Sequence, residues 1–319
     1  MPPCQPGCPR ILACDLDGTL LNGKGVLTEA TAAALRKAVA SGVEVVFATG
    51  RRHSFAWTML APLGLDPETV LISSNGAISR TFGGRPLDRI GMPVETALQV
   101  CHQLNDFRDS LVFTFDRTGP GALVVENIAA LQARLSRWVE SNLHELEAVL
   151  PLERAFAGGE EPVQAMICGT LAAMNKGLAV LDAATEQAEN LRKIISIHRT
   201  EYPARDLSIV DLMPNGCSKG SALARLAANR GVDAADIMAI GDNMNDAEML
   251  AYAGRAVVME NSPEELLGMA AANSWSVTGS NEFDGAARAI LRMLEEDFRS
   301  DRGRRGDRPL RLPTEFLEG

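Results

Sequence analysis

Short apolar runs that end abruptly in polar or turn residues recur in the first and last parts of the chain. They cover residues 11–15, 43–49, 70–74, 236–241 and 255–259. Between them, segments such as 29–41 and 219–230 carry apolar side chains at intervals of three and four, the spacing of a helix with one buried face. Strands that alternate with helices of this length predict a parallel sheet covered by helices on both faces.

The middle of the chain has a different pattern. It predicts, in order, helix 94–107, a strand pair over 111–127 around a Gly-Pro turn, helix 129–143, strand 163–168, helix 171–190 and strand 193–200. Adjacent strands joined by a tight turn are antiparallel, so this part is expected to form a separate α+β module inserted into the α/β core. The expected division is a tail over 1–10, a core over 11–82 and 207–298, an insert over 83–206 and a loose tail over 299–319.

Composition narrows the class of protein. A chain of 319 residues is long enough for two domains. The net charge of −10 argues against a nucleic-acid partner, because binding to a phosphate backbone needs clustered Lys and Arg. No apolar stretch approaches the roughly 18 residues of a membrane span, and residues 1–9 lack the apolar run of a signal peptide. We therefore expect a cytoplasmic protein, with its six scattered cysteines reduced.

The sequence Asp15-Leu16-Asp17-Gly18-Thr19 directly follows the first predicted strand. Asp15 and Asp17 would share a side if the extended path continued, because side chains alternate along a strand. The carboxyl ends of strands are where open α/β sheets bind ligands. Gly18 would let the chain turn sharply and present backbone N–H groups to an anion. A strand followed by a plain polar turn is the alternative interpretation.

Three further segments end a predicted strand or begin a predicted helix. They are Thr49-Gly50-Arg51 after the second strand, Ser218-Lys219-Gly220 at the start of a helix, and Gly241-Asp242-Asn243-Met244-Asn245-Asp246 after a buried strand. Each has a structural explanation by itself: a common Thr-Gly turn, a solvated lysine, or an Asn/Asp-rich loop with a helix N-cap.

Taken together and in this order, the four segments resemble the motifs of the haloacid dehalogenase superfamily of phosphohydrolases. The insert follows Ser74-Asn75-Gly76-Ala77, the position of the class IIB cap in Cof-like hydrolases. The resemblance implies a Rossmann-like, doubly wound parallel sheet with an inserted α+β cap that acts as a lid.

The resemblance also implies roles for individual residues. Asp15 would be the nucleophile that forms an aspartyl-phosphate, and Asp17 the general acid and base. Thr49 would hydrogen-bond the phosphoryl group, and Lys219 would neutralise its charge. The remaining implied roles are Mg²⁺ binding by Asp15, Asp242 and the backbone carbonyl of Asp17, support from Asp246, and substrate binding by Gly18, Thr19, Gly50, Arg51, Asn75 and Asn245.

The expected substrate is a small phosphorylated metabolite, such as a sugar phosphate, and the expected state is a monomer or homodimer. Three alternatives share these motifs. A phosphotransferase or mutase would use the same nucleophile with an alcohol as acceptor. A receiver-type switch would be phosphorylated without turnover, and a phosphosugar-binding relative would have no activity. Asp17, two residues after the nucleophile, favours hydrolysis over the switch, and the intact set of catalytic residue types argues against the inactive relative.

Overall fold

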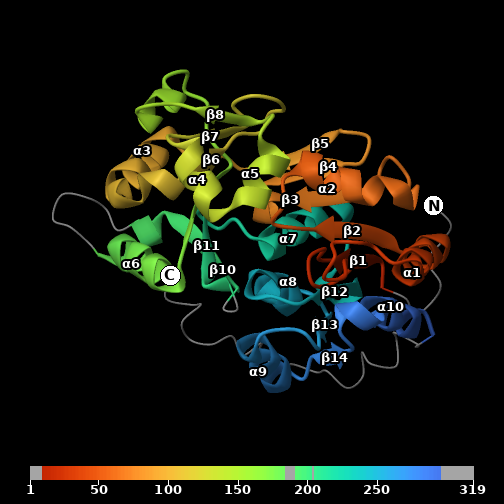
Figure 1. Ribbon diagram of the computed structural model, residues 1–319. Coiled ribbons are helices and arrows are strands. Elements are labelled where there is room, and N and C mark those ends of the chain that lie inside the picture. The colour runs from red at the N-terminus through yellow and green to blue at the C-terminus, as the bar shows by residue number, and fades with distance from the viewer. Residues whose placement is uncertain (1–8, 184–190, 203–204, 296–319) are drawn as a thin grey trace. The chain divides into compact units, whose positions relative to one another are not determined.

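The computed structural model describes residues 9–183, 191–202 and 205–295 (Figure 1). The chain divides into two compact units, a core unit made of the residues up to Asp88 and from Ser218 on, and an inserted unit made of residues 89–217. The predicted tail over 299–319 and most of the one over 1–10 lie outside the described residues. In the described residues, no helix combines the length and apolar character that a bilayer span requires.

The core unit is built on one large sheet. Its described strands form neighbouring parallel pairs from β14 to β3, whereas β4 runs antiparallel to β3. The prediction of a doubly wound parallel sheet is therefore confirmed. In spatial order the strands are β14 (Ser276–Thr278), β13 (Arg255–Met259), β12 (Ile237–Gly241), β1 (Ile11–Cys14), β2 (Glu44–Ala48), β3 (Val70–Ser73), β4 (Ile78–Thr81) and β5 (Pro86–Arg89).

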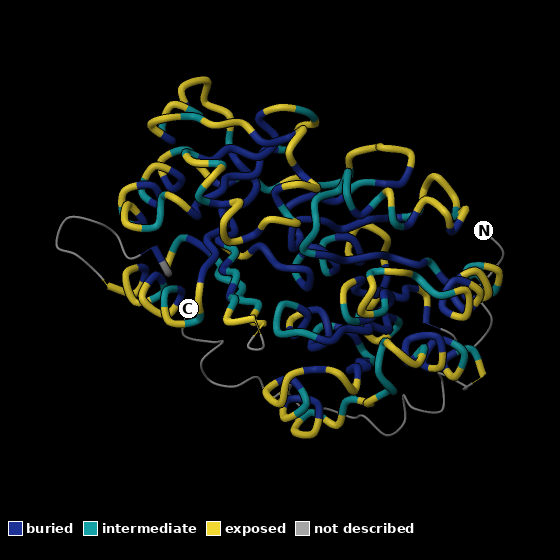
Figure 2. The backbone as a smooth tube through the Cα atoms, viewed as in Figure 1, coloured by how far each residue is buried: buried dark blue, intermediate teal, exposed yellow. Residues whose placement is uncertain are grey.

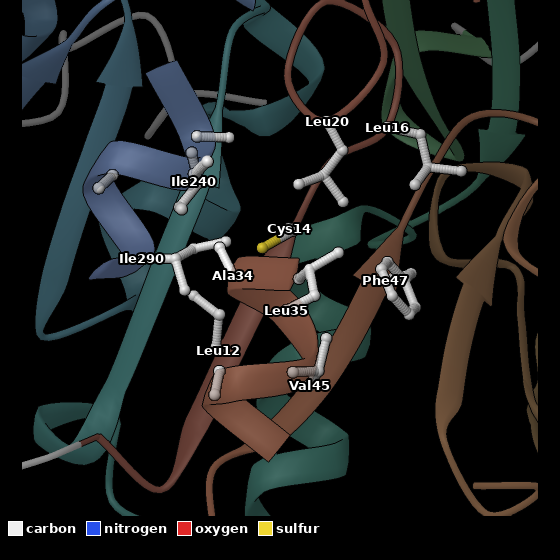
Figure 3. Packing of buried hydrophobic residues seen from close by; sticks show 14 of the residues in the cluster. Leu12, Cys14, Leu16, Leu20, Ala34, Leu35, Val45, Phe47, Ile240 and Ile290 are labelled. Carbon is white, nitrogen blue, oxygen red and sulfur yellow. The ribbon is translucent and has the colours of Figure 1, made fainter. Parts of the chain in front are cut away.

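Helices cover both faces of the core sheet, and successive strand residues pack on opposite sides. Leu12 and Cys14 of β1 pack in one apolar cluster (Figure 3), whereas Ile11 and Ala13 pack in the other. Burial on both faces explains why these strands are continuously apolar. On the first face lie α1 (Glu29–Ala40), α2 (His53–Leu60) and α10 (Gly285–Glu295), and on the second α7 (Lys219–Arg230), α8 (Ala247–Tyr252) and α9 (Glu264–Asn273).

The inserted unit has its own sheet and its own core. In spatial order its described strands are β10 (Ile195–Tyr202), β11 (Leu207–Pro214), β9 (Gln164–Gly169), β6 (Val112–Thr114), β7 (Leu123–Val125) and β8 (Leu146–Ala148). Figure 2 shows buried backbone in both units, flanked by exposed loops. One face of the sheet packs on α3 (Val94–Gln103) and α6 (Leu171–Asp182), and the other on α4 (Ile128–Arg134) and α5 (Ser136–Asn142).

In the structure the inserted unit covers residues 89–217, so both of its boundaries differ from the predicted range of 83–206. Residues 86–89 add the edge strand β5 to the core sheet, so the insert begins later than residue 83. Residues 207–214 do not lead back to the core, because β11 pairs with β10 and β9 in the inserted sheet. The predicted helix 129–143 is also two helices, which are divided at Leu135, where ψ is 52°. The predicted helix 171–190 ends at Asp182, and residues 184–190 lie outside the described part.

Candidate active site

The predicted site residues follow four neighbouring strands of the core sheet or begin the helix beside them. Strands β12, β1, β2 and β3 are adjacent and parallel, so their carboxyl ends meet at one edge. Polar loops converge there, as expected at the ligand-binding edge of an open α/β sheet. The core unit contains all of the predicted residues: Asp15, Asp17, Gly18, Thr19, Thr49, Gly50, Arg51, Asn75, Lys219, Asp242, Asn245 and Asp246.

Three buried carboxylates gather around one ammonium group. Lys219 donates hydrogen bonds from Nζ to Asp15 Oδ1 at 2.6 Å and to Asp246 Oδ1 at 2.7 Å. Asp242 accepts a hydrogen bond from the Thr19 hydroxyl at 2.7 Å. One oxygen from each of Asp15, Asp242 and Asp246 lies within 4.8 Å of the others. We call these three carboxylates the acidic cluster. With Lys219, its formal charge is −2.

Lys219 is held in place by the start of α7. Ser218 is the N-cap of this helix, and its side chain and that of Ser221 bond reciprocally to each other's backbone N–H groups. Ser218 also bonds to the carboxylate of Glu248 through its hydroxyl group. A Cβ atom at position 220 would lie 2.6 Å from the backbone carbon of Glu248, so glycine lets α7 approach α8. These contacts explain why Ser-Lys-Gly-Ser begins the helix.

Asp246 uses its oxygens within the protein. Its Oδ2 accepts the backbone N–H groups of Asp242 at 3.0 Å and Asn243 at 3.1 Å, and its Oδ1 accepts Lys219. Gly241 permits this close approach, because a Cβ atom there would lie 2.6 Å from the Cβ atom of Asp246. Asp15 and Asp242 therefore remain as the carboxylates best placed to bind a further ligand.

Burial makes the acidic cluster electrostatically unfavourable by itself. It raises the pKa of Asp242 to about 7, and the charge of Asp246 contributes further. Burial also raises the pKa of Asp15 well above its usual value, although Lys219 opposes that shift. Burial alone would lower the pKa of Lys219, but Asp15 and Asp246 outweigh it and keep the ammonium charged. Oxygen ligands with an excess of two negative charges suit a divalent cation such as Mg²⁺.

We expect the stability of the metal-free protein to depend on pH through Asp242. Its folded pKa of about 7 exceeds the unfolded value of about 4, so the folded state binds this proton more tightly. The resulting stability is complete below pH ~4 and is lost as the pH rises through 7. In chelator, the melting temperature should therefore fall across this range relative to that of the Asp242→Asn variant. Parallel curves for the two proteins would contradict the expectation.

Asp17 lies outside the acidic cluster and pairs with Arg51. The guanidinium group donates from Nε and from a terminal nitrogen to the two carboxylate oxygens, both at 2.5 Å. The Asp17 and Arg51 side chains are 48% and 29% exposed. β1 ends at Cys14, so the extended path that would place Asp15 and Asp17 on one side does not continue. Arg51 also lies over the ring of Phe55, 4.8 Å from its centroid.

The loops after β2 and β3 are tied together. Thr49 is buried, its hydroxyl oxygen accepts the backbone N–H of Arg51 at 3.1 Å, and its carbonyl accepts that of Asn75 at the same distance. Asn75 has a left-handed conformation, with φ at 49°, and its side-chain oxygen accepts the amide of Asn245 at 3.1 Å. At Gly50, a Cβ atom would lie 3.0 Å from that same oxygen. These contacts join the second and fourth motifs.

Asn261 lies outside the four sequence motifs and was not predicted to belong to the site. Its side-chain amide donates to the carbonyl of Gly18 at 2.9 Å, and its oxygen accepts the backbone N–H of Asn281 at 3.0 Å. Asn261 therefore holds the turn that follows Asp17. Only its place in the loop directly after the buried strand β13 could have suggested this contact, because an Asn before a Ser-Pro pair otherwise predicts a helix start.

Replacing Gly18 with alanine should disturb the acidic cluster directly. Gly18 has a φ of 82°, and a Cβ atom there would lie 2.2 Å from Asp242 Oδ2. Because Asp242 is buried and bonded to Thr19, we expect Gly18→Ala to reduce catalysis at this site about 100-fold, the scale expected from a misplacement of roughly 1 Å.

The matched control for this change is Gly84→Ala. Gly84 has a φ of 87° but has no atom within 4 Å of the added Cβ. This variant should lose only the roughly 1–2 kcal/mol of a left-handed alanine and should keep its activity. Steady-state kinetics on both proteins test the comparison, and equal activities would show that the contact with Asp242 is unimportant.

With this geometry established, comparison with known proteins defines the family. The chain belongs to the haloacid dehalogenase-like hydrolases, whose family profile matches residues 12–290. The predicted family is confirmed, and the protein is an enzyme of the hydrolase class.

The chain is also similar to individual proteins of known name or structure. It is 31% identical over 264 residues to a HMP-PP phosphatase of Yersinia pseudotuberculosis, covering 81% of this chain and 86% of that protein. It is 29% identical over 305 residues to phosphatase YwpJ of Bacillus subtilis, covering 89% of this chain and all of that protein. Among solved structures, a sugar phosphatase of subclass IIB matches with a TM-score of 0.70 and 20% identity, over 89% of this chain and 99% of that one. Because the identity to the sugar phosphatase is only 20%, this similarity shows a shared fold and no more.

Proposed function

We propose that this protein is a Mg²⁺-dependent phosphatase that hydrolyses a small phosphate monoester through an aspartyl-phosphate on Asp15. The observation that carries the proposal is the pairing of buried Asp15 with Lys219 beside the carboxylate of Asp242. A nucleophilic carboxylate needs compensation of charge before it can approach a phosphate dianion. Lys219 supplies part of that compensation, and a divalent cation held by Asp15 and Asp242 would supply the rest.

The cation would be held by Asp15, Asp242 and the backbone carbonyl of Asp17. When bound, it would neutralise the charge that develops on the phosphoryl oxygens and on the nucleophile. The chemistry of the donor set supports this assignment, because all of the candidate ligands are oxygens and Asp246 is already engaged by three hydrogen bonds. Asp246 would then orient Lys219 and the loop that carries Asp242.

In the first step, a carboxylate oxygen of Asp15 attacks phosphorus and displaces the alcohol of the substrate. Asp17 donates a proton to the departing oxygen. In the second step, Asp17 takes a proton from water, and the resulting hydroxide attacks phosphorus, releases phosphate and restores Asp15. Asp17 is suited to this task because its side chain is half-exposed and is not buried among the other carboxylates.

Arg51 would link substrate binding to the release of Asp17 for proton transfer. Its guanidinium group now stabilises the charge of Asp17 through two hydrogen bonds. A bound phosphoryl group would compete for the same donors, because guanidinium binds phosphate and carboxylate in similar geometry. Substrate binding would thereby release Asp17 to carry the proton. We therefore propose that Arg51 binds the phosphoryl group when substrate is present.

The other polar residues would position the phosphoryl group. Thr49 and Lys219 would donate to its oxygens, and backbone N–H groups of the turns that contain Gly18, Thr19 and Gly50 would contribute. Asn75 and Asn245, whose side chains are hydrogen-bonded to each other, would also contact the phosphoryl group. Such preorganised donors contribute most of the acceleration in phosphoryl transfer.

The named relatives support a small substrate. One carries the name HMP-PP phosphatase, another the name phosphatase YwpJ, and a structural neighbour is a sugar phosphatase. We propose a sugar phosphate or a similar small phosphate monoester as the substrate of this protein. Asp17 supports hydrolysis rather than a stable phosphorylated switch, because a base two residues after the nucleophile can activate water.

A phosphate-release assay tests the proposal. The purified protein should release phosphate from an aryl phosphate in Mg²⁺, lose this activity in excess chelator and regain it when Mg²⁺ is restored. A panel of sugar phosphates, nucleotides and phosphorylated cofactors should then contain compounds with higher kcat/KM than the aryl phosphate. Undiminished activity in chelator would exclude the cation, and transfer of phosphate to an added alcohol in preference to water would favour a phosphotransferase.

A further inference from the structure

A cavity of about 830 Å³ lies within the inserted unit, and all of the residues that line it belong to that unit. It is formed where β9 ends and β11 begins. The 3-10 helix Asn105–Ser110, the junction of α4 with α5 and the first turns of α6 complete its walls. Its volume falls within the roughly 300–1,000 Å³ of small-molecule sites.

Three arginines from separate segments line the cavity. Arg134 ends α4, Arg137 lies in α5, and Arg205 precedes β11. In the described part of the chain, the guanidinium groups of Arg137 and Arg205 have no hydrogen-bond or ion-pair partner, and Arg134 reaches only the carbonyl of Cys168, at 3.5 Å. Other arginines of the unit, such as Arg108, are paired with carboxylates.

Arg134, Arg137 and Arg205 are exposed, so their guanidinium groups are accessible to a ligand from solvent. Two acidic residues, Asp106 and Asp206, also line the cavity, so the three arginines leave a formal charge of +1. The carboxylate of Asp206 accepts the backbone N–H of Leu171 at 3.1 Å and so is engaged at the start of α6. Free guanidinium groups that face one cavity favour an anion, and they bind phosphate in a bidentate manner.

The remaining walls are apolar and partly aromatic. Phe107 and Trp138 line the cavity together with Leu135 and Met174. Leu135 and Met174 belong to the two apolar clusters that cover opposite faces of the inserted sheet, so the cavity is set in well-packed structure. A flat ring can stack on such aromatic side chains, as bases do in nucleotide sites.

From these observations, we propose that the inserted unit carries a binding site for a nucleoside phosphate, separate from the acidic cluster. The phosphate groups would bind Arg134, Arg137 and Arg205, and the base would lie against Trp138 and Phe107. Neither the acidic cluster nor any catalytic candidate contributes to the cavity. Binding at this cavity therefore does not depend on the proposed phosphatase activity.

Calorimetric titration of the full-length Asp15→Asn protein with ADP tests the site. This variant cannot use Asp15 to consume the probe, and excess chelator removes any cation that would bind ADP at the acidic cluster. We expect ADP to bind with one-to-one stoichiometry and adenosine to bind at least tenfold more weakly, because the charged contacts would be missing. Adenosine binding as tight as that of ADP would overturn the assignment of an anion site.

Two changed proteins locate the binding. Arg134→Gln combined with Arg137→Gln should weaken ADP binding at least tenfold, and Arg205→Gln alone, in another segment, should weaken it in the same direction. The matched control combines Arg117→Gln with Arg154→Gln, two arginines of the inserted unit that do not line the cavity. Thermal melting establishes that each variant is folded. No binding of ADP at millimolar concentration, or equal binding by all variants, would overturn the proposal.

Discussion

Asp15→Asn should abolish phosphate release while leaving the protein folded. The loss of a catalytic nucleophile typically lowers kcat by about four orders of magnitude or more, which corresponds to roughly 5.5 kcal/mol of activation free energy. The asparagine oxygen can still accept the hydrogen bond that Lys219 donates to Asp15 at 2.6 Å. Its neutral amide also relieves repulsion from Asp242 and Asp246. We therefore expect a melting temperature equal to or above that of the unchanged protein.

Two measurements make this prediction specific to Asp15. Asp233→Asn, a change of the same kind at an exposed position of the core unit, should leave activity intact. Acid quench during turnover, followed by mass spectrometry, should detect a phosphorylated Asp15 peptide in the unchanged protein and none in the Asp15→Asn variant. Turnover by Asp15→Asn at the ordinary rate would remove this residue from the nucleophile role.

Lys219→Met should cost both activity and stability. Methionine fills a similar volume, but it leaves Asp15, Asp242 and Asp246 buried without the ammonium group that now lies 2.6 and 2.7 Å from two of them. Removing one partner of a buried ion pair costs about 3–5 kcal/mol. Urea unfolding should therefore show a much lower free energy of unfolding at neutral pH in chelator. Acidification should recover part of it, since protonation removes the uncompensated charge.

Mg²⁺ provides a second way to examine this variant. Because the acidic cluster without Lys219 has a formal charge of −3, added Mg²⁺ should stabilise Lys219→Met more than it stabilises the unchanged protein. Lys37→Met on the exposed side of α1 is the control and should change neither stability nor its dependence on Mg²⁺. A Lys219→Met protein as stable as this control would mean that the carboxylates are compensated by some other group.

The core sheet could be predicted from local sequence to within about one residue at the ends of β1, β3, β12 and β13. Those strands are buried on both faces, so apolar residues continue until the chain reaches a polar turn. The return from the insert could not be predicted in this way. Residues 207–214 alternate buried and half-buried side chains, which indicates a strand but not the sheet that contains it. Their partners, β10 and β9, are chosen by tertiary packing.

The motifs predict which residues lie at the sheet edge, but several contacts of these residues could not be predicted. The ion pair between Asp17 and Arg51 joins two loops, and the bond between Asn261 and Gly18 spans 243 residues. In each of these two pairs, the sequence around one residue contains no pattern that predicts the other residue as its partner. The position of a motif at the end of a strand indicates that its side chains lie at the sheet edge. Which hydrogen-bond partner each side chain has at that edge depends on the direction that the turns give it.

The bond between Lys219 and Asp15 joins residues 204 positions apart, which has a consequence for biosynthesis. Ribosomes add about 5–20 residues per second, so Asp15 emerges on the order of ten to forty seconds before its lysine partner is made. During that interval the first strands have neither β12 nor α7 to cover them. We expect the nascent half-core to need protection by a chaperone, or to remain unfolded, until α7 and β12 have been synthesised.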